Sequence, residues 1–291
     1  MIERSEIQRV AASLGVDPQV IDQDYALGCF LNALVQQSDV QKSWYFKGGT
    51  ALAKCHFPEY RFSEDLDFTV LASIGIERFR TILEVATHTM QEQIGIRSDV
   101  KEPSVEIVED EYGKETYEGK TYYQGIWMFR GDPRAIRVHI TRDEIVVFPP
   151  IVSRILHRYS DATELASVMV QSYALEEVFA EKLRAFSGQR RYAVARDLFD
   201  LDYLSRGRVE TQASFRAFRK KCAVKGRDPE RIEINAIKER KGEYEMNWQS
   251  NLEYLLPNAL KRPFEEAWDT SIHLLEQAKA ISRSSPSQSS P

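Results

Sequence analysis

The sequence predicts an α+β protein, in which a mixed β-sheet with flanking helices is followed by a mainly helical region. Two patterns in the chain of 291 residues support this prediction. Strand-like and helix-like segments alternate up to Phe148, whereas beyond Pro149-Pro150 the apolar residues recur at helical spacing almost to the end of the chain. Because proline cannot donate to a sheet ladder, we expect the proline pair to end the sheet.

The first half of the chain begins with two expected helices. One starts at about Ser5, and the other is opened by Asp17-Pro18, a capping residue followed by a first-turn proline, and runs to near Gln37. Further elements are expected along the chain: strands near residue 43 and from residue 65, a helix over about 76–93, and strand-like stretches over 105–109, 122–129 and 135–148.

We expect the chain to have three parts. The alternating segment should form a first, catalytic domain over residues 1–160, and the helical segment should form a second domain over residues 161–281. Residues 282–291 lack apolar side chains, which predicts a disordered tail.

A diglycine turn and two alternating carboxylates are the most informative residues. Asp65 and Asp67 lie two residues apart on an expected strand, so both side chains point to the same face. Ionised carboxylates side by side repel each other unless a cation lies between them, and hard oxygen ligands select Mg²⁺ or Mn²⁺. Gly48 and Gly49 let the backbone approach a phosphate, and Thr50, whose hydroxyl could cap or bind phosphate, begins an expected helix whose amides favour an anion. The combination predicts nucleotide transfer from an NTP.

Each of these signals has a common structural explanation when it occurs alone. A Gly-Gly-Thr sequence is more often a tight turn before a helix, and an Asp-x-Asp sequence is usually a solvated strand face. Arg61 and Ser63 precede the acids, and the planar fork of Arg61 could orient Asp65 or a phosphate. A surface ion pair of Arg61 with Glu59 or Glu64 is the alternative.

Lys182 is a cation on the apolar stripe of an expected helix, which spans residues 174–186. Ammonium groups on inward faces are rare unless they are paired or face a cleft. The functional interpretation is that Lys182 holds nucleotide phosphates or offsets charge near the carboxylates; the alternative is a stem packed on apolar surface with its head in water. On the next helix, Asp197 could position Lys182 or the nucleotide, while pairing with a nearby arginine is the competing explanation, most of all for Asp200.

Four motifs, in their order along the chain, resemble those of the AbiEii/AbiGii toxin family. They are Lys-Gly-Gly-Thr-Ala-Leu from Lys47, Arg-Phe-Ser-Glu-Asp-Leu-Asp-Phe from Arg61, Ala-Glu-Lys-Leu from Ala180, and Arg-Asp-Leu-Phe-Asp-Leu from Arg196. This family belongs to the polymerase-beta-like nucleotidyltransferase superfamily and includes the MenT toxins of mycobacteria. The resemblance covers roughly residues 40–205, and the ordered set is far more specific than any one motif.

The resemblance implies a minimal nucleotidyltransferase domain that uses Mg²⁺, or Mn²⁺, to transfer a nucleoside monophosphate from an NTP. It also implies a toxin of a type IV toxin–antitoxin or abortive-infection system, opposed by a separately encoded antitoxin, and several relatives act on the 3′ end of tRNA. The residues that match assign nucleotide binding to Lys47, Gly48, Gly49, Thr50, Arg61, Ser63 and Lys182, metal binding to Asp65 and Asp67, and catalysis to Asp65, Asp67, Lys182 and Asp197.

One position departs from the superfamily pattern. Members commonly carry a third carboxylate on a later strand, and the strand-like segment 135–141 has His139 where that acid is expected. A histidine could serve as a base or as a softer metal ligand. The alternative, which we favour, is a packed and hydrogen-bonded residue.

The charges of the chain are segregated. Residues 206–241 contain twelve Lys or Arg and five Asp or Glu, a local net charge of +7 in a chain whose net charge is -5. A positive helical segment on an acidic protein suits binding to a phosphate backbone, and Tyr203, Phe215 and Phe218 could stack on exposed bases. We therefore expect an RNA acceptor held by basic side chains, namely Arg216, Arg219, Lys220, Lys221 and Lys225. Pairing of this segment with an acidic antitoxin, or with the acidic half of the chain, is the alternative.

Other features place the protein in the cytoplasm and away from membranes. The three cysteines suggest neither a disulfide framework nor a zinc site, and the N-terminus lacks the pattern of a signal peptide. No apolar run is long enough to cross a membrane. Two other functions stay open: the same chemistry on a protein hydroxyl or a small molecule such as an aminoglycoside, and a noncatalytic nucleotide- or RNA-binding protein, to which His139 in place of an acid lends weight.

Overall fold

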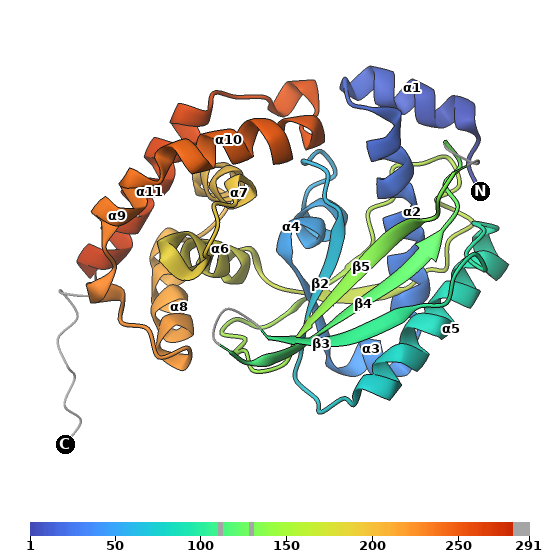
Figure 1. The fold of residues 1–291 in the computed structure, drawn as a ribbon, viewed down its shortest axis with the longest axis horizontal. Coiled ribbons are helices and arrows are strands. Elements are labelled where there is room, and N and C mark those ends of the chain that lie inside the picture. The colour runs from blue at the N-terminus through green and yellow to red at the C-terminus, as the bar shows by residue number, and fades with distance from the viewer. Residues whose placement is uncertain (110–112, 128–130, 282–291) are drawn as a thin grey trace. The chain divides into compact units, whose positions relative to one another are not determined.

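The structure, a computed structural model, describes residues 1–109, 113–127 and 131–281 (Figure 1). These residues form two compact units. The sheet unit comprises Met1–Glu144, Pro150–Tyr173 and Tyr254–Lys261, and the helical unit comprises Ile145–Pro149, Ala174–Glu253 and the chain from Arg262 onward. The boundary expected after residue 160 therefore falls inside the sheet unit, and the tail expected over 282–291 lies outside the described residues.

The sheet unit is built on a mixed, seven-stranded sheet with the strand order β3-β4-β5-β2-β1-β7-β6. Strand β2 runs antiparallel to β1 on one side and parallel to β5 on the other. The strands are β1 (Trp44–Lys47), β2 (Asp65–Val70), β3 (Ser104–Glu109), β4 (Glu115–Tyr123), β5 (Arg134–Thr141), β6 (Ile151–Arg154) and β7 (Met169–Ser172).

Two expectations about the sheet are wrong. The proline pair at 149–150 does not end it, because β6 and β7 follow the prolines and extend the sheet beyond β1. Proline is tolerated directly before an edge strand such as β6, where the ladder has only one partner. The strand expected over 122–129 also lies earlier, as β4, and residues 128–130 lie outside the described part of the chain.

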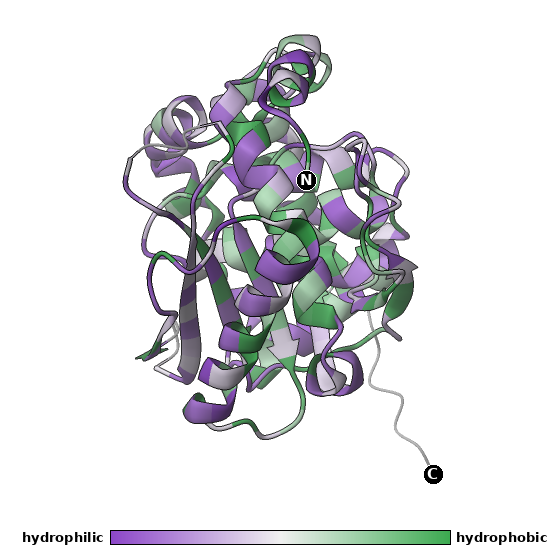
Figure 2. Ribbon diagram, turned by 90° about the vertical axis from the view of Figure 1, so that its right-hand side faces the viewer, coloured by the Kyte–Doolittle hydropathy of each residue, from purple (hydrophilic) through white to green (hydrophobic). Residues whose placement is uncertain are grey.

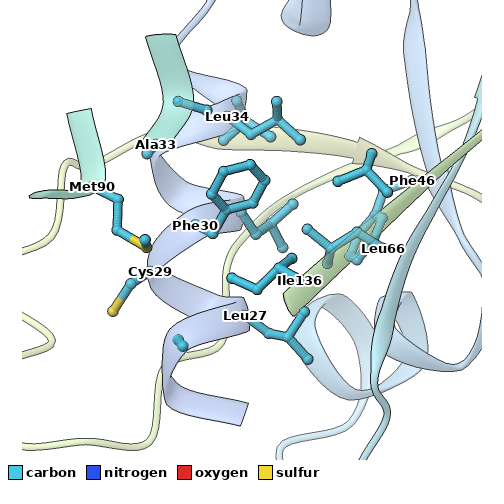
Figure 3. Packing of buried hydrophobic residues seen from close by; sticks show 14 of the residues in the cluster. Leu27, Cys29, Phe30, Ala33, Leu34, Phe46, Leu66, Met90 and Ile136 are labelled. Carbon is cyan, nitrogen blue, oxygen red and sulfur yellow. The ribbon is translucent and has the colours of Figure 1, made fainter. Parts of the chain in front are cut away.

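Two long helices pack on one face of this sheet, α2 (Pro18–Val35) and α5 (Ile76–Ile94) (Figure 1). Helix α2 begins as expected, with the Asp17 side chain accepting a hydrogen bond from the Gln19 amide. Figure 3 shows apolar side chains of α2 facing the sheet residues Phe46, Leu66 and Ile136, all of them buried. The other helices of this unit are α1 (Arg4–Leu14), α3 (Ser38–Ser43), α4 (Gly48–Ala51) and a π-helical turn over Leu52–His56.

The helical unit has its own core, in which aromatic rings from several helices meet. The Phe186 and Tyr244 rings both lie against Trp268, with ring centroids 6.0 and 5.5 Å from it. The helices are α6 (Leu175–Arg184), α7 (Ala195–Ser205), α8 (Thr211–Val224), α9 (Ile234–Glu239), α10 (Lys241–Asn251) and α11 (Phe264–Ile281). The helices in Figure 2 mix polar and apolar residues, and within the described residues none is both long and apolar enough to cross a membrane.

A buried ion pair ties the π-helical turn to α2. Lys54 Nζ lies 2.8 Å from Asp24 Oδ2 and donates to the Asp24 carbonyl at 3.1 Å, and both side chains are buried. Burial alone would raise the pKa of Asp24, but the charges of Lys54 and Arg158 and hydrogen bonds hold it below its ordinary value of 3.8. Because a lowered pKa favours the folded state only while the group is ionised, this contribution is present above pH 3.8 and is lost on further acidification.

Breaking this pair should destabilise the protein strongly. We expect Lys54→Met to lower the free energy of unfolding by about 3–5 kcal/mol, because it leaves the Asp24 carboxylate buried without its counter-charge. The double variant Lys54→Met/Asp24→Asn should recover part of that loss, since it removes the uncompensated charge. Urea denaturation would measure both, and a double variant no more stable than the single one would contradict the expectation.

Candidate active site

Strand β2 divides its side chains between the core and the opposite face of the sheet. Leu66 and Phe68 are fully buried, whereas Asp65 and Asp67 point to the other face and are partly exposed. The two carboxylates therefore lie side by side, as the spacing of the sequence predicts.

The diglycine turn lies directly against Asp67. Gly48 has φ +76°, and a Cβ at this position would come within 2.5 Å of Asp67 Oδ2. Thr50 Oγ1 donates to the Asp65 carbonyl at 2.5 Å and is buried, so this hydroxyl fastens the turn to β2. The helix after the turn is short, because α4 covers Gly48–Ala51 and continues as the π-helical turn. The turn and the two acids thus form one local structure within the sheet unit.

Arg61 lies beneath the turn and not at the surface. Its side chain is 1% exposed, and a Cβ on Gly49 would come within 2.2 Å of Arg61 Nη2. Nη1 donates to the Phe62 carbonyl at 3.1 Å. The alternative of a surface ion pair for Arg61 is therefore wrong, and the glycine at position 49 is needed for the guanidinium to fit.

Two further predicted residues are Lys47, which directly precedes the diglycine turn, and Ser63, which follows Arg61 by two residues. Lys47 is buried at the end of β1, opposite Asp67 in the strand register, with Nζ 5.8 Å from the centroid of the Tyr173 ring. Ser63 is half-buried and lines a pocket of about 280 Å³ together with Glu64, Gln23 and Arg134. Both residues thus belong to the sheet unit that carries the acids.

Gly48 should be more sensitive to substitution than a glycine that has only an unusual backbone angle. Gly95, which caps α5 with φ +82°, has nothing within 4 Å of an added Cβ, so Gly95→Ala should cost about 1–2 kcal/mol of backbone strain. Gly48→Ala bears the same strain and also displaces Asp67, so it should cost more. Denaturant unfolding would measure this difference, and equal losses of stability in the two variants would show that the contact with Asp67 does not matter.

On the other side of the acids, β5 presents two basic side chains. Arg137 lies opposite Asp65 and His139 opposite Asp67 in the parallel register. Arg137 Nη1 is 3.8 Å from Asp65 Oδ1, and His139 Nδ1 is 3.1 Å from Asp67 Oδ1. His139 Nε2 lies 3.6 Å from Glu118 Oε2 on β4, so the imidazole is placed between two carboxylates.

These carboxylates keep His139 protonated over a wide pH range. Partial burial alone would lower its pKa, but the hydrogen bond to Asp67 and the charges of Asp67, Asp65 and Glu118 raise the pKa to about 9. Position 139, where the superfamily pattern has an acid, thus carries a protonated histidine that is hydrogen-bonded to Asp67. This geometry agrees with the interpretation of His139 as a hydrogen-bonded residue.

The titration of His139 can be followed directly. A pKa of about 9 means that the stabilisation from its charge is fully present below the ordinary value of 6.5 and is lost as the pH rises through 9. We expect the ring proton signals of His139 in an NMR titration of the nucleotide-free protein to move with a midpoint near 9. In Asp67→Asn the midpoint should fall, because the hydrogen bond to a charged partner is lost; a midpoint near 6.5 in the unaltered protein would contradict the geometry.

In the helical unit, Lys182 forms an ion cluster with two aspartates of α7. Lys182 Nζ lies 2.7 Å from Asp197 Oδ1 and 3.0 Å from Asp200 Oδ2. Arg190 Nη1 adds a contact of 3.0 Å to Asp197 Oδ2. Both aspartates are buried, so neither is paired at the helix surface, and the competing explanation of a nearby arginine is confirmed for Asp197 by its contact with Arg190. The ammonium does not extend into water, since its side chain is only 13% exposed and is held by these carboxylates.

The prediction of RNA binding by Lys221 is wrong. This side chain is fully buried, and its Nζ lies 2.6 Å from Glu177 Oε1 and 3.2 Å from Glu181 Oε1. Phe215 and Phe218 are also buried in the core of the helical unit, so neither ring is available to stack on a base. The sequence predicts a surface position for these residues because the many charged residues of the segment obscure the buried apolar stripe of α8.

The other predicted RNA-binding residues of this segment reach solvent to different degrees. Arg216 and Lys220 are exposed, and Arg216 lies 3.6 Å from Glu210. Arg219 and Lys225 are half-buried. The surface cations of α8 are therefore fewer than the sequence indicates.

Sequence reasoning missed Arg137 and Lys54. Arg137 is two residues before His139, so strand alternation would have placed both on one face, but the parallel register that sets Arg137 opposite Asp65 cannot be read from local sequence. Lys54 belongs to none of the four motifs. Its partner Asp24 is far away in sequence, and no short-range pattern links them.

Comparisons with known proteins show the family of the chain and similar folds. The sequence model described as "Nucleotidyl transferase AbiEii toxin, Type IV TA system" matches residues 29–270. The fold is similar to that of MenT4, a nucleotidyltransferase toxin from Mycobacterium tuberculosis, with 20% sequence identity, a TM-score of 0.58, and coverage of 99% of this chain and 91% of MenT4. It is also similar to JHP933 from Helicobacter pylori, with 17% identity, a TM-score of 0.55, and coverage of 91% and 94%. Among curated proteins, none matches the chain.

Proposed function

We propose that this chain, which belongs to the AbiEii family of nucleotidyl transferase toxins of type IV toxin–antitoxin systems, transfers a nucleoside monophosphate from an NTP to the 3′ end of an RNA such as a tRNA, with the help of a divalent metal ion. Family membership makes the protein a nucleotidyltransferase and implies a nucleotide substrate and a separate antitoxin. The observation that carries the assignment of the site is the contact between the diglycine turn and Asp67, beside Asp65 on the face of β2 that points away from the core.

The reaction is a displacement at the α-phosphorus of the NTP. The hydroxyl oxygen of the acceptor forms a bond to this phosphorus, and the bond from phosphorus to the bridging oxygen breaks. Pyrophosphate leaves with the bonding electron pair, and the hydroxyl proton passes to solvent. In such reactions the protein mainly positions the phosphates and offsets charge. The glycines at positions 48 and 49 leave room beside the backbone for the Asp67 carboxylate and the Arg61 guanidinium, and their amides are the proposed contacts of the phosphates.

Asp65 and Asp67 fit a Mg²⁺ or Mn²⁺ ion. Among the described residues no three His, Cys, Asp or Glu side chains form a metal site, so the protein offers two carboxylates and not a closed cage. Mg²⁺ is commonly held in this way, by one or two carboxylates with water and substrate phosphates as its other ligands. When bound, the ion would offset the charge of the triphosphate. The two acids would also be relieved of their mutual repulsion.

Lys182 and Asp197 enter the proposal through their match to the family motifs. Lys182 is already paired with two buried aspartates in the helical unit. We propose that Asp197 and Asp200 set the position of the ammonium, which would then bind a phosphate with its remaining donor capacity. Removing Lys182 would take one positive charge from two buried carboxylates, of which Asp197 keeps its contact with Arg190, so a charge-conserving variant such as Lys182→Arg is the one that tests its role apart from folding.

The RNA acceptor is supported by the charge of residues 206–241, which is +7 in a chain that is otherwise acidic. Arg216 and Lys220 on α8 are exposed, and Arg219 and Lys225 are partly so. These four side chains, without Lys221, are the proposed contacts of the helical unit with the phosphate backbone of the RNA.

A transfer assay tests the proposed function. The protein would be incubated with α-labelled NTPs, Mg²⁺, total RNA and cell lysate, and we expect label to enter RNA. Asp65→Asn and Asp67→Asn should each lower transfer by at least about a hundredfold, because a charge that offsets the phosphates is lost. Thermal midpoints should change little, since both acids are partly exposed.

Glu106→Gln is the matched control, because Glu106 on β3 is an exposed carboxylate and its loss should leave transfer unchanged. Label on protein or on a small molecule would contradict the RNA acceptor. Absence of label from every fraction would contradict the enzymatic function, and unfolding of both aspartate variants would show that the acids are structural.

A further inference from the structure

We propose that Arg137 binds a phosphate group of the RNA acceptor, on the side of the paired acids that faces away from the diglycine turn. The inference rests on the proposed function and adds to it a residue that holds the acceptor. It concerns only the sheet unit, which contains every group involved.

The strand order places the acids between two different structures. Strand β2 lies between β1 and β5. The diglycine turn continues β1 and contacts Asp67, whereas Arg137 lies on β5, opposite Asp65 in the register. The turn and Arg137 therefore lie on opposite sides of the carboxylate pair.

The geometry of the reaction assigns a substrate to each side. In phosphoryl transfer the attacking and leaving oxygens lie roughly in line with the phosphorus. If the glycine turn holds the triphosphate, pyrophosphate leaves on the β1 side, and the attacking hydroxyl arrives from the β5 side. The acceptor then meets the side chains of β5 before any others on this face of the sheet.

Arg137 has the chemistry and the freedom to hold a phosphate there. Its side chain is 54% exposed, and its contact with Asp65 is 3.8 Å long, beyond the range of a hydrogen bond. Its planar guanidinium suits bidentate contact with a phosphate. The neighbouring cation Lys120 is held more closely, since its Nζ lies 3.0 Å from Glu118 and 3.2 Å from Glu106.

A cation at this place favours one class of acceptor. An RNA has a phosphate next to the sugar whose hydroxyl reacts, so the guanidinium would contact it while that hydroxyl reaches the nucleotide. An unmodified protein side chain offers no such phosphate, and a polycationic aminoglycoside would be repelled by Arg137. The positive side chains of β5 thus distinguish acceptors by charge.

The test measures acceptor binding apart from catalysis. The full chain and Arg137→Ala would be titrated, without NTP, against a labelled single-stranded oligoribonucleotide and against total tRNA at several salt concentrations. We expect Arg137→Ala to bind roughly tenfold more weakly, the effect of one charge-assisted contact. The dependence of log affinity on log salt should become less steep by about 0.7, as for one lost phosphate contact on a single strand.

In transfer assays the KM for RNA should rise while the KM for NTP stays constant, and Arg137→Lys should restore part of the affinity.

The matched control is Arg80→Ala, since Arg80 is an exposed arginine of α5 with a glutamate contact of 3.3 Å, and α5 packs on the other face of the sheet. It should change neither affinity nor salt dependence. Unchanged RNA affinity in Arg137→Ala, or a rise in the KM for NTP alone, would overturn the inference while wild-type transfer to RNA still supported the proposed function. Failure of the wild-type protein to label RNA would instead overturn the proposed function.

Discussion

The alternation of side chains along β2 is the constraint on which both the core and the site depend. Leu66 and Phe68 are buried in the cluster formed with α2, and their neighbours Asp65 and Asp67 must then face the other way. A shift of one residue in the pairing of β2 would bury both carboxylates and expose both apolar side chains. Burial of the apolar side chains in the core therefore fixes the face of the sheet on which the two carboxylates lie, without a further interaction.

Two neighbouring carboxylates carry an electrostatic cost, which the sheet unit offsets with its own cations. Arg137 and His139 of β5 stand opposite Asp65 and Asp67, and Glu118 supports His139 from β4. The raised pKa of His139 reflects the negative charge of the carboxylates, because the two aspartates raise this pKa more than burial lowers it. In the helical unit, neighbouring carboxylates are likewise offset by a cation, since the Lys182 ammonium contacts the two buried aspartates Asp197 and Asp200. Each of these two groups combines carboxylates with cations that offset most of their charge.

Local patterns predicted the parts of the structure that depend on neighbouring residues. The cap at Asp17, the helices α2 and α5, and the same-face placement of Asp65 and Asp67 all follow from spacing and residue type. Features that depend on distant pairing could not be predicted in this way. The strands β6 and β7 are four residues each and depend on the pairing of β7 with β1. Likewise, the burial of Lys221 depends on Glu177, on another helix, and the charge of the surrounding segment pointed to the opposite conclusion.

The π-helical turn after the diglycine bend adds a geometric requirement. A π-helix holds one more residue per turn than an α-helix would, and such turns are uncommon outside functional sites. This turn carries Lys54, whose ammonium pairs with Asp24 on α2, so the position of Lys54 within the turn matters for the pair. Deletion of residue 52 or 53 would move Lys54 one position along this turn and so carry its side chain away from Asp24. This stretch of the chain is therefore intolerant of changes in length, although it lies in a connection between two strands, where insertions and deletions are usually accepted.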